Sequence, residues 1–180
     1  MPQDIDVRPA TPDDLPQLMA FDHSSTTEHV WQLDLRREPR DSQVVATFRE
    51  VRLPRPVNLA YPHDPKALAD DWEGKAITLV ATSGIQPIGY AAVSEQRSSG
   101  AWISDLVVVP RWRRHGVGRA LLAAAQGWAA EHGHRRLFVE MQSKNHPAIR
   151  LALQLGYEFC GYNDHYYSTQ DIALFFVRAL

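Results

Sequence analysis

A basic turn with two glycines lies between an apolar run and an amphipathic run in the second half of the chain. Gly116 and Gly118 leave the backbone of this turn without side chains, and no carboxylate occurs between Asp105 and Glu131. Arginines crowd the same stretch: Arg111, Arg113, Arg114 and Arg119. Free N–H groups at a helix start attract anions, as guanidinium groups do, and glycine lets a phosphate approach the backbone closely. The pattern predicts an anion site suited to a diphosphate.

The alternative for this turn is a solvated basic loop whose glycines serve tight packing. The turn is not a dinucleotide-binding fingerprint, because Leu121 stands where the third glycine would be, and it lacks the lysine of a P-loop. Its surroundings favour the anion site. Residues 106–109 are continuously apolar, as in a strand covered on both faces, and an amphipathic helical pattern follows the turn.

Hydrophobic periodicity and turn residues indicate the elements that must position this turn. A helix is expected over 116–132, where apolar residues recur at helical spacing and Gly133 ends the run. Further helices are expected from residue 11 to about 21, over 65–72 and over 147–155. Strands are expected around Ile5 and Val7 and over 30–36, 42–53, 76–81, 88–93, 101–109, 136–141, 157–161 and 171–177. Turns are expected at 83–87 and 98–100, and the proline-rich stretch 53–65 is expected to cross the surface as a connection.

Element order and composition together predict the class of protein. Strands dominate the first part of the chain and then alternate with two helices, which predicts a mixed α/β, or α+β-like, sheet packed by helices. The 180 residues suit a single domain over 1–180. A net charge of −2 gives no overall attraction to nucleic acid or to a membrane, so neither is expected as a partner. One cysteine and a start without a signal-peptide pattern predict a cytoplasmic protein.

Histidine and cysteine side chains add little chemistry in this pattern. His132 and His134 lack partner ligands at metal-binding spacing, so no metal site is expected. Cys160 has no identifiable base beside it, so its thiol is expected to be buried and to fill space in the core rather than to act as a nucleophile.

The strand, the turn from Arg113 to Gly118 and the helix after it resemble the acetyl-CoA signature of the GNAT superfamily of N-acetyltransferases. The runs 145–149 and 155–157 are similar to the second conserved block of that superfamily. The resemblance extends from Ile5 to the C-terminus and is most specific in the second half. Within the superfamily the chain is most similar to the streptothricin acetyltransferase group, on the runs 25–27, 48–51, 145–149 and 160–161.

The resemblance implies a fold and a cofactor. The fold is a GNAT-type central mixed, mostly antiparallel twisted sheet flanked by helices, with a V-shaped splay between the central strands. The cofactor is acetyl-CoA, whose pantetheine arm would pair like an added strand with the backbone of Leu106, Val107 and Val108. The residues implied to hold the pyrophosphate form the turn: Arg113, Arg114, His115, Gly116, Val117, Gly118 and Arg119.

A second implied contact comes from the next conserved block, where Asn145 would touch the cofactor and Ala148 would leave space beside it. Two plainer interpretations stay open. Residues 106–108 can be core strand as well as binding edge, and Asn145 can be a helix cap before Pro147.

The implied reaction is direct attack of a neutral primary amine on the acetyl thioester. The amine must lose a proton, and a backbone N–H near Val107 could stabilise the oxyanion. The tyrosine that usually serves the superfamily as acid is replaced here by Ala152. Tyrosines near that position are Tyr157, Tyr162, Tyr166 and Tyr167. Tyr167 matches a tyrosine of the streptothricin group and is placed first, whereas Tyr157 is expected in the core; the thiolate could also leave unaided.

Two carboxylates are candidates for the base. Asp105 precedes a bulge-prone strand segment and Glu140 ends the next strand. The alternatives are an ion pair with one of the arginines for Asp105 and a solvated strand end for Glu140. Acids of the first half could also line a pocket for a cationic amine: Asp22, Glu28, Asp34, Glu38 and Glu50.

The leading hypothesis is an acetyl-CoA-dependent N-acetyltransferase acting on a small-molecule primary amine, with a streptothricin-like antibiotic as the specific expectation. A second hypothesis is acetylation of a protein N-terminus, a polyamine or another small amine. A third, prompted by Ala152, is a non-catalytic acyl-CoA-binding protein. The resemblance also points to a homodimer, which is common in the family.

Overall fold

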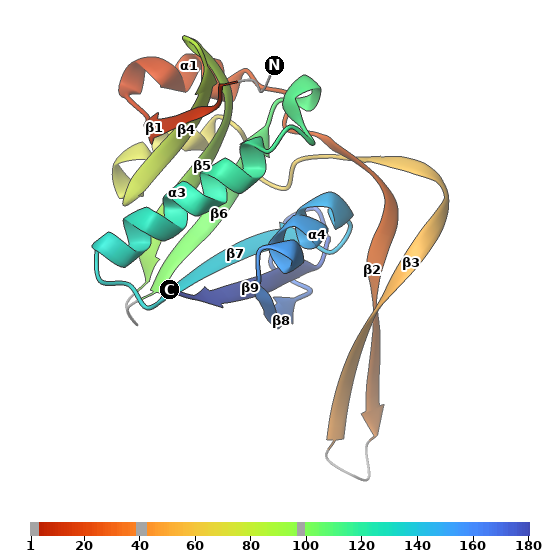
Figure 1. Cartoon of the computed structure of the whole chain (residues 1–180). Coiled ribbons are helices and arrows are strands. Elements are labelled where there is room, and N and C mark those ends of the chain that lie inside the picture. The colour runs from red at the N-terminus through yellow and green to blue at the C-terminus, as the bar shows by residue number, and fades with distance from the viewer. Residues whose placement is uncertain (1–3, 39–42, 97–99) are drawn as a thin grey trace.

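The computed structural model describes residues 4–38, 43–96 and 100–180, and its centre is a seven-stranded sheet (Figure 1). The strand order is β1-β4-β5-β6-β7-β9-β8. The bounds are β1 Asp6–Pro9, β4 Ile77–Ser83, β5 Gln86–Gln96, β6 Gly100–Val108, β7 Arg136–Gln142, β8 Glu158–Asn163 and β9 Ala173–Ala179. The β6–β7 pair is parallel, and the other neighbouring pairs are antiparallel. The expected mixed, mostly antiparallel sheet is confirmed.

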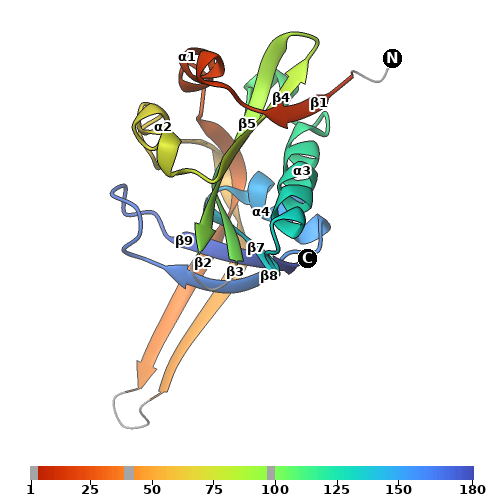
Figure 2. The ribbon, with the colours of Figure 1, turned by 90° about the vertical axis from the view of Figure 1, so that its left-hand side faces the viewer.

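Helices cover both faces of this sheet (Figure 2). Their bounds are α1 Leu15–Met19, α2 Ala67–Asp70, α3 Val117–Glu131 and α4 His146–Gln154. Successive strand residues point to opposite faces of a sheet. Accordingly, Val80 packs in one core with Leu18 of α1, whereas its neighbour Leu79 packs in the other with Leu121 of α3.

The two central strands separate after a short pairing. β6 and β7 are in register only from Gly100 and Arg136 to Ile103 and Val139. At the same level the register between β5 and β6 shifts, so that Ser104 is an extra residue on β6, as in a β-bulge. A bulge bends its strand and increases the local twist. The expected V-shaped splay therefore opens between the second halves of β6 and β7.

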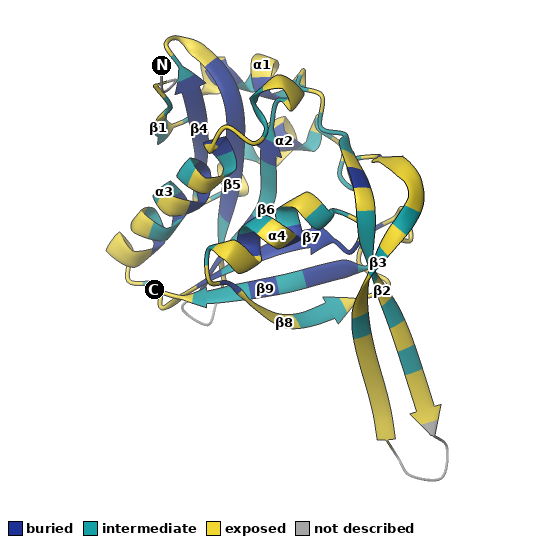
Figure 3. Ribbon diagram, turned by 45° about the vertical axis from the view of Figure 1, so that its right-hand side comes forward, coloured by how far each residue is buried: buried dark blue, intermediate teal, exposed yellow. Residues whose placement is uncertain are grey.

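A long hairpin forms a second, two-stranded sheet. Its strands are β2 Ser25–Glu38 and β3 Gln43–Leu59, and its far end extends away from the seven-stranded sheet (Figure 3). Trp31 anchors it, because the Trp31 backbone N–H donates to the Ser143 carbonyl over 2.9 Å. The Trp31 ring also lies against Phe159 and Phe176 at centroid separations of 6.1 and 5.8 Å.

The expectation of a surface connection over residues 53–65 is wrong for its first half, since β3 continues to Leu59. Proline cannot donate to a strand ladder, which argued against a strand through Pro54 and Pro56. The structure accommodates both prolines at a register shift: Thr27 pairs with Val57, but His29 pairs with Arg52. The prolines therefore fall where the ladder is interrupted.

Other element boundaries differ by a few residues. The helix expected from residue 11 to about 21 is a 3₁₀ turn over Pro12–Asp14 followed by α1. The Asp14 carboxylate holds this start, because it accepts from the Thr11 backbone N–H over 2.8 Å and from the Arg8 guanidinium over 2.8 and 2.9 Å. These bonds keep the pKa of Asp14 well below its usual range. The start of the expected strand at residue 42 and most of the turn at 98–100 lie outside the described residues.

Gly89 allows the close approach of β5, β6 and α3, which gives a test of the fold. A Cβ atom there would lie 2.8 Å from the Val107 carbonyl oxygen and 3.1 Å from Cγ1 of Val117. We expect Gly89→Ala to lower the free energy of unfolding by about 1–3 kcal/mol, the usual cost of overpacking. Gly127→Ala in α3 is the matched control, because a Cβ there would meet no atom within 4 Å. Denaturant unfolding that finds the two variants equally stable would contradict this packing.

Candidate active site

The turn after β6 has the backbone of an anion-binding loop. A 3₁₀ turn over Pro110–Trp112 leads to Arg114 and Gly116, which have positive φ angles of 66° and 91°. A side chain at Gly116 would be strained, although the space around its Cβ position is open to at least 4 Å. The first intrahelical bond of α3 runs from the Ala120 N–H to the Gly116 carbonyl over 3.0 Å. The amides before Ala120 therefore face outward at the positive end of the helix.

The two glycines of the turn serve different purposes. Gly116 is required for the backbone angle. Gly118 is required for packing, because a Cβ atom there would lie 2.9 Å from Cδ2 of Leu151 in α4. The alternative of glycine for tight packing is therefore correct for Gly118.

The Arg113 side chain fastens the turn instead of extending from it. Its Nε donates to the Val108 carbonyl over 2.9 Å, and its Nη2 donates to the Ser24 carbonyl over 2.6 Å. Burial lowers the pKa of this guanidinium. The side chains of Arg114, His115 and Arg119 are exposed, and His115 Nδ1 lies 2.8 Å from the Arg113 carbonyl.

The edge of β6 beside the splay is open in the described structure. Residues 106–108 pair with β5 on one side, while β7 has already departed on the other. The side chain of Val107 is buried, and Leu106 and Val108 pack against the opposite core. The core-strand interpretation therefore holds for the side chains, and the backbone edge no longer pairs with β7, although the Val108 carbonyl already accepts from Arg113 Nε.

Asn145, the second predicted cofactor contact, makes a hydrogen bond within the protein. Asn145 Oδ1 accepts from the Ala148 N–H over 3.3 Å, so Asn145 is the N-cap of α4. The capping interpretation is confirmed for this atom. Ala152, which replaces the usual tyrosine, is buried in the core.

The splay brings Asp105 of β6 and Glu140 of β7 into one polar cluster. Asp105 Oδ1 accepts a hydrogen bond from the Tyr61 hydroxyl, and its Oδ2 accepts from Ser104 Oγ over 2.6 Å. Lys75 Nζ lies 3.9 Å from Asp105 Oδ2. The ion pair expected with an arginine is wrong, since the cation is Lys75.

Glu140 is buried, with 1% of its side chain exposed, so the expectation of a solvated strand end is wrong. Its Oε2 accepts from Trp102 Nε1 over 2.6 Å and from the Tyr166 hydroxyl over 2.7 Å. Its Oε1 lies 3.3 Å from Nε2 of His63. Three different segments of the chain therefore hold this one carboxylate.

Tyr61 and His63, which sequence analysis missed, join the two sides of the splay. Tyr61 reaches Asp105 on β6 and His63 reaches Glu140 on β7. The only local signal is their spacing of two residues. Both side chains reach the splay because of the path that the chain takes between β3 and β4, and no short-range sequence pattern reveals that path. Burial, reinforced by the Asp105 charge, raises the pKa of Tyr61 and keeps this phenol protonated.

Tyr90 extends the cluster to the segment before β2. The Tyr90 hydroxyl lies 3.1 Å from His23 Nε2, and His23 Nδ1 lies 2.8 Å from the Phe21 carbonyl. A carbonyl can only accept, so Nδ1 carries the proton and Nε2 accepts from Tyr90. Burial lowers the pKa of His23, which favours the neutral ring.

The predicted tyrosines have distinct surroundings. Tyr167 is buried, and its ring centroid lies 5.5 Å from that of His63 in a T-shaped arrangement. Burial, together with the Glu140 charge, raises the pKa of Tyr167. Tyr157 belongs to the core, as expected, and its hydroxyl accepts from Gln126 Nε2 over 3.0 Å. Tyr162 packs on Phe48 at a centroid separation of 5.2 Å.

The acids of the first half do not gather into a pocket. Asp22 binds Ser24, Asp34 pairs with Arg36, and Glu50 pairs with His146. Glu28 is exposed, and the side chain of Glu38 lies outside the described part. Cys160 is exposed on the edge strand β8, so the expectation of a buried thiol is wrong.

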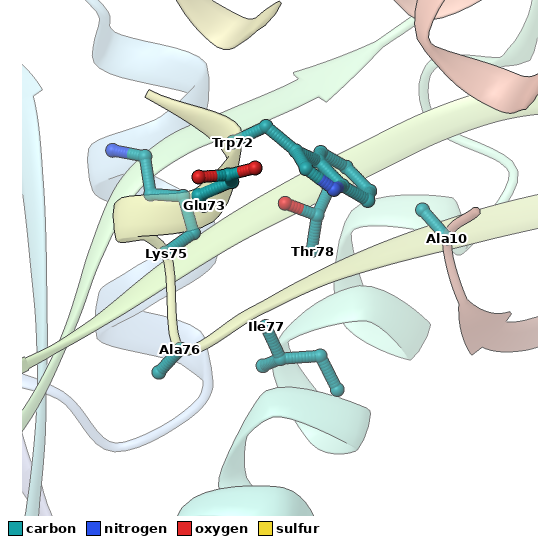
Figure 4. Close-up of a pocket in the computed structure, with 7 residues that line it drawn as sticks. All are labelled: Ala10, Trp72, Glu73, Lys75, Ala76, Ile77 and Thr78. Atoms are coloured by element: carbon teal, nitrogen blue, oxygen red, sulfur yellow. The ribbon is translucent and has the colours of Figure 1, made fainter. Parts of the chain in front are cut away.

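A shallow depression of about 420 Å³ lies at the start of β4 (Figure 4). Its lining residues are Ala10, Trp72, Glu73, Lys75, Ala76, Ile77 and Thr78. Lys75 directs its ammonium away from the Trp72 ring and toward Ser104, whose Oγ it reaches over 3.0 Å. Asp105 and Glu140 do not line the depression, and Lys75 links it to the carboxylate cluster.

Metal-ligand groups and membrane-spanning helices are both absent from the described ranges. Residues 4–38, 43–96 and 100–180 contain no group of three His, Cys, Asp or Glu side chains arranged to hold a metal ion. Every helix within those ranges is too short or too polar to cross a bilayer.

Comparison with known proteins places this arrangement in a family. The model of the acetyltransferase (GNAT) family matches residues 43–157. A streptothricin acetyltransferase of Streptomyces lavendulae is 30% identical over 172 residues, covering 89% of this chain and 85% of the relative.

Solved structures extend the similarity to the whole fold. The crystal structure of a nourseothricin acetyltransferase superposes with a TM-score of 0.81 at 29% identity, covering 97% of this chain and 98% of that one. A candidate streptothricin acetyltransferase of Bacillus anthracis, solved with acetyl coenzyme A, gives a TM-score of 0.73 at 20% identity, covering 100% and 99%. The chain belongs to the GNAT family of acetyltransferases.

The geometry of the turn predicts how acetyl-CoA affinity responds to a single methyl group. Gly116→Ala forces a side chain onto a left-handed residue, which costs about 1–2 kcal/mol and displaces the amides at the start of α3. We expect the Kd for acetyl-CoA, measured by calorimetry, to rise about tenfold, the change that corresponds to 1.4 kcal/mol. Gly84→Ala is the matched control: it has a φ of 58° and open surroundings, in the β4–β5 turn. Equal affinities in the two variants would remove the turn from the cofactor site.

Proposed function

We propose that this acetyltransferase moves the acetyl group of acetyl-CoA to a primary amine of a small cationic molecule, by direct attack on the thioester. The observation that carries the proposal is the pair of carboxylates, Asp105 and Glu140, on the two strands that diverge beside the open edge of β6. An ammonium group is attracted to such a site, and the strand edge can hold a donor alongside it.

The chain offers a coherent set of groups for acetyl-CoA, which supplies an acetyl thioester activated for attack. Backbone groups of residues 106–108 would pair with the pantetheine arm. The amides from Arg114 to Arg119 would hold the pyrophosphate, supported by the open space at Gly116. Asn145 keeps only part of its side chain for the cofactor, because its Oδ1 caps α4. A backbone N–H near Val107 would stabilise the oxyanion.

The acceptor side suits a cation with an aliphatic amine. Carboxylates and aromatic rings together favour an ammonium group over neutral molecules. The rings that surround the two carboxylates come from Tyr61, His63, Tyr90, Trp102, Tyr166 and Tyr167. Because relatives at 30% and 29% identity are named for streptothricin and nourseothricin, we propose a streptothricin-like antibiotic as the acceptor.

Asp105 and Tyr167 take separate parts in this proposal. Asp105 is fixed by Tyr61 and Ser104, and it supplies negative charge that draws the ammonium toward β6. Tyr167, whose raised pKa keeps its phenol protonated at neutral pH, would donate a hydrogen bond to the departing sulfur. It thereby stands in for the acid that Ala152 cannot provide.

An acceptor panel tests the function. Thiol release from acetyl-CoA is measured with streptothricin, spermidine and a peptide that has a free N-terminus. We expect kcat/KM for streptothricin to exceed the others by about 10²-fold, since a site that pairs with several polar groups strongly rejects molecules that lack them. A preference for the peptide or for spermidine would contradict the acceptor assignment. Acetyl-CoA binding without thiol release for any amine would favour a non-catalytic binding protein.

Tyr167→Phe tests the proposed acid. Removing the hydroxyl should lower kcat about ten- to a hundredfold, as loss of proton donation to a leaving group does, while the Kd for acetyl-CoA stays unchanged. Tyr162→Phe is the matched control, because Tyr162 packs on Phe48 away from Glu140. If both variants turn over like the wild type, Tyr167 is not the acid.

A further inference from the structure

His63 occupies a distinctive place at the mouth of the splay. It lies between β3 and α2, and 32% of its side chain is exposed, whereas its Nε2 is buried. Its ring packs edge-to-face against Tyr61 and Tyr167, each at a centroid separation of 5.5 Å. The two phenol rings fix the plane of the imidazole, which leaves one edge toward Glu140 and part of the ring toward solvent.

The Glu140 carboxylate directs one of its two oxygens toward the His63 ring. Its Oε2 is taken by Trp102 and Tyr166, so Oε1 is the oxygen that faces the imidazole, 3.3 Å from Nε2. The direction of the contact departs from that of a linear hydrogen bond, so it is an ion pair in character. A buried carboxylate without a cation or a donor is costly. The pair therefore favours an imidazole that carries a proton on Nε2.

The charges around His63 come from several elements. Glu140 of β7 and Asp105 of β6 favour the protonated ring, and Lys75, which follows α2, opposes it. Tyr61 and Tyr167 face the ring as protonated phenols. The contact with Glu140 is the largest influence and raises the pKa of His63, although burial acts in the opposite direction.

We propose that His63, oriented by Glu140, is the group that removes the proton from the acceptor ammonium; this rests on the acetyl transfer proposed above. In this step a ring nitrogen of neutral His63 takes one proton from R–NH₃⁺, which leaves the amine lone pair free. That lone pair forms the new bond to the acetyl carbon, and the carbon–sulfur bond breaks as the tetrahedral intermediate collapses. The sulfur leaves with the bonding electrons and takes a proton from the Tyr167 hydroxyl, which regains one from the medium. The amide nitrogen loses its remaining extra proton to the medium.

His63 is better placed for this step than either carboxylate. Both oxygens of Asp105 already accept hydrogen bonds, from Tyr61 and Ser104. Glu140 is nearly inaccessible and is shielded by His63 itself. An incoming ammonium therefore meets the imidazole first. Glu140 becomes a positioning residue, in the manner of a carboxylate that fixes the orientation of a catalytic histidine.

The test compares His63→Ala with wild type, using the acceptor amine found most active and the complete chain. Loss of a general base lowers the rate about 10²–10⁴-fold, so we expect kcat/KM to fall by at least 10²-fold while the Kd for acetyl-CoA is unchanged. Added imidazole should restore activity at least tenfold by taking over the missing ring. His165→Ala is the matched control, because 92% of its side chain is exposed, and it should behave like the wild type.

The pH profile separates a base from a packing residue. In the wild type, kcat/KM should rise as pH increases through the pKa of His63, because only the neutral ring accepts a proton. Glu140→Gln removes the charge that raises this pKa, so the acidic limb should move to lower pH. Should His63→Ala fold poorly, His63→Gln keeps the bulk and should show the same loss and no His63 limb.

Two results would overturn the proposal. One is activity within threefold of the wild type in both His63 variants. The other is a loss of activity that imidazole does not rescue, with the acidic limb unchanged in Glu140→Gln. A wild-type chain that acetylates no amine would instead contradict the proposed function itself, and that outcome is recognised before any variant is measured.

Discussion

The early end of the parallel pairing between β6 and β7 is the constraint on which the site depends. After Ile103 and Val139 the two strands separate, and the extra residue Ser104 bends β6 away. Separation exposes a strand edge whose backbone groups must find partners, and it sets two carboxylates on opposite sides of one opening. A continuous β6–β7 ladder would close this edge, and Ser104 rather than Asp105 would then lie opposite Glu140.

The structure meets this opening with a polar network supplied by distant parts of the chain. Residues 60–63 bridge it, because Tyr61 binds Asp105 on one strand and His63 faces Glu140 on the other. A third contact joins this segment to β7: the Ala60 carbonyl accepts a hydrogen bond from Gln142 Nε2 over 3.3 Å. Tyr166, from the β8–β9 connection, donates a further hydrogen bond to Glu140. A carboxylate held by several donors keeps its orientation, which is what a preorganised site requires.

The sequence predicts the parts of this site that depend on local order. The turn at Gly116, helix α3 and the central strands follow from periodicity and from residues with special backbone preferences. Asp105 and Glu140 could be selected because they stand near the ends of apolar strands. The sequence predicts too short a second strand for the long hairpin, because Pro54 and Pro56 suggest a loop wherever the register shift that tolerates them is unknown. Tyr61, His63 and Lys75 could not be found, since their role comes only from the tertiary path between β3 and β4.

Hydrogen exchange with and without acetyl-CoA tests whether the diverging strands and the turn after them form the binding site. On addition of acetyl-CoA, we expect slower amide exchange in two stretches at once, 106–108 at the open edge of β6 and 114–119 at the start of α3. The depression at the start of β4 should show no change. Protection confined to residues 72–78, or protection of neither predicted stretch by bound acetyl-CoA, would contradict the account.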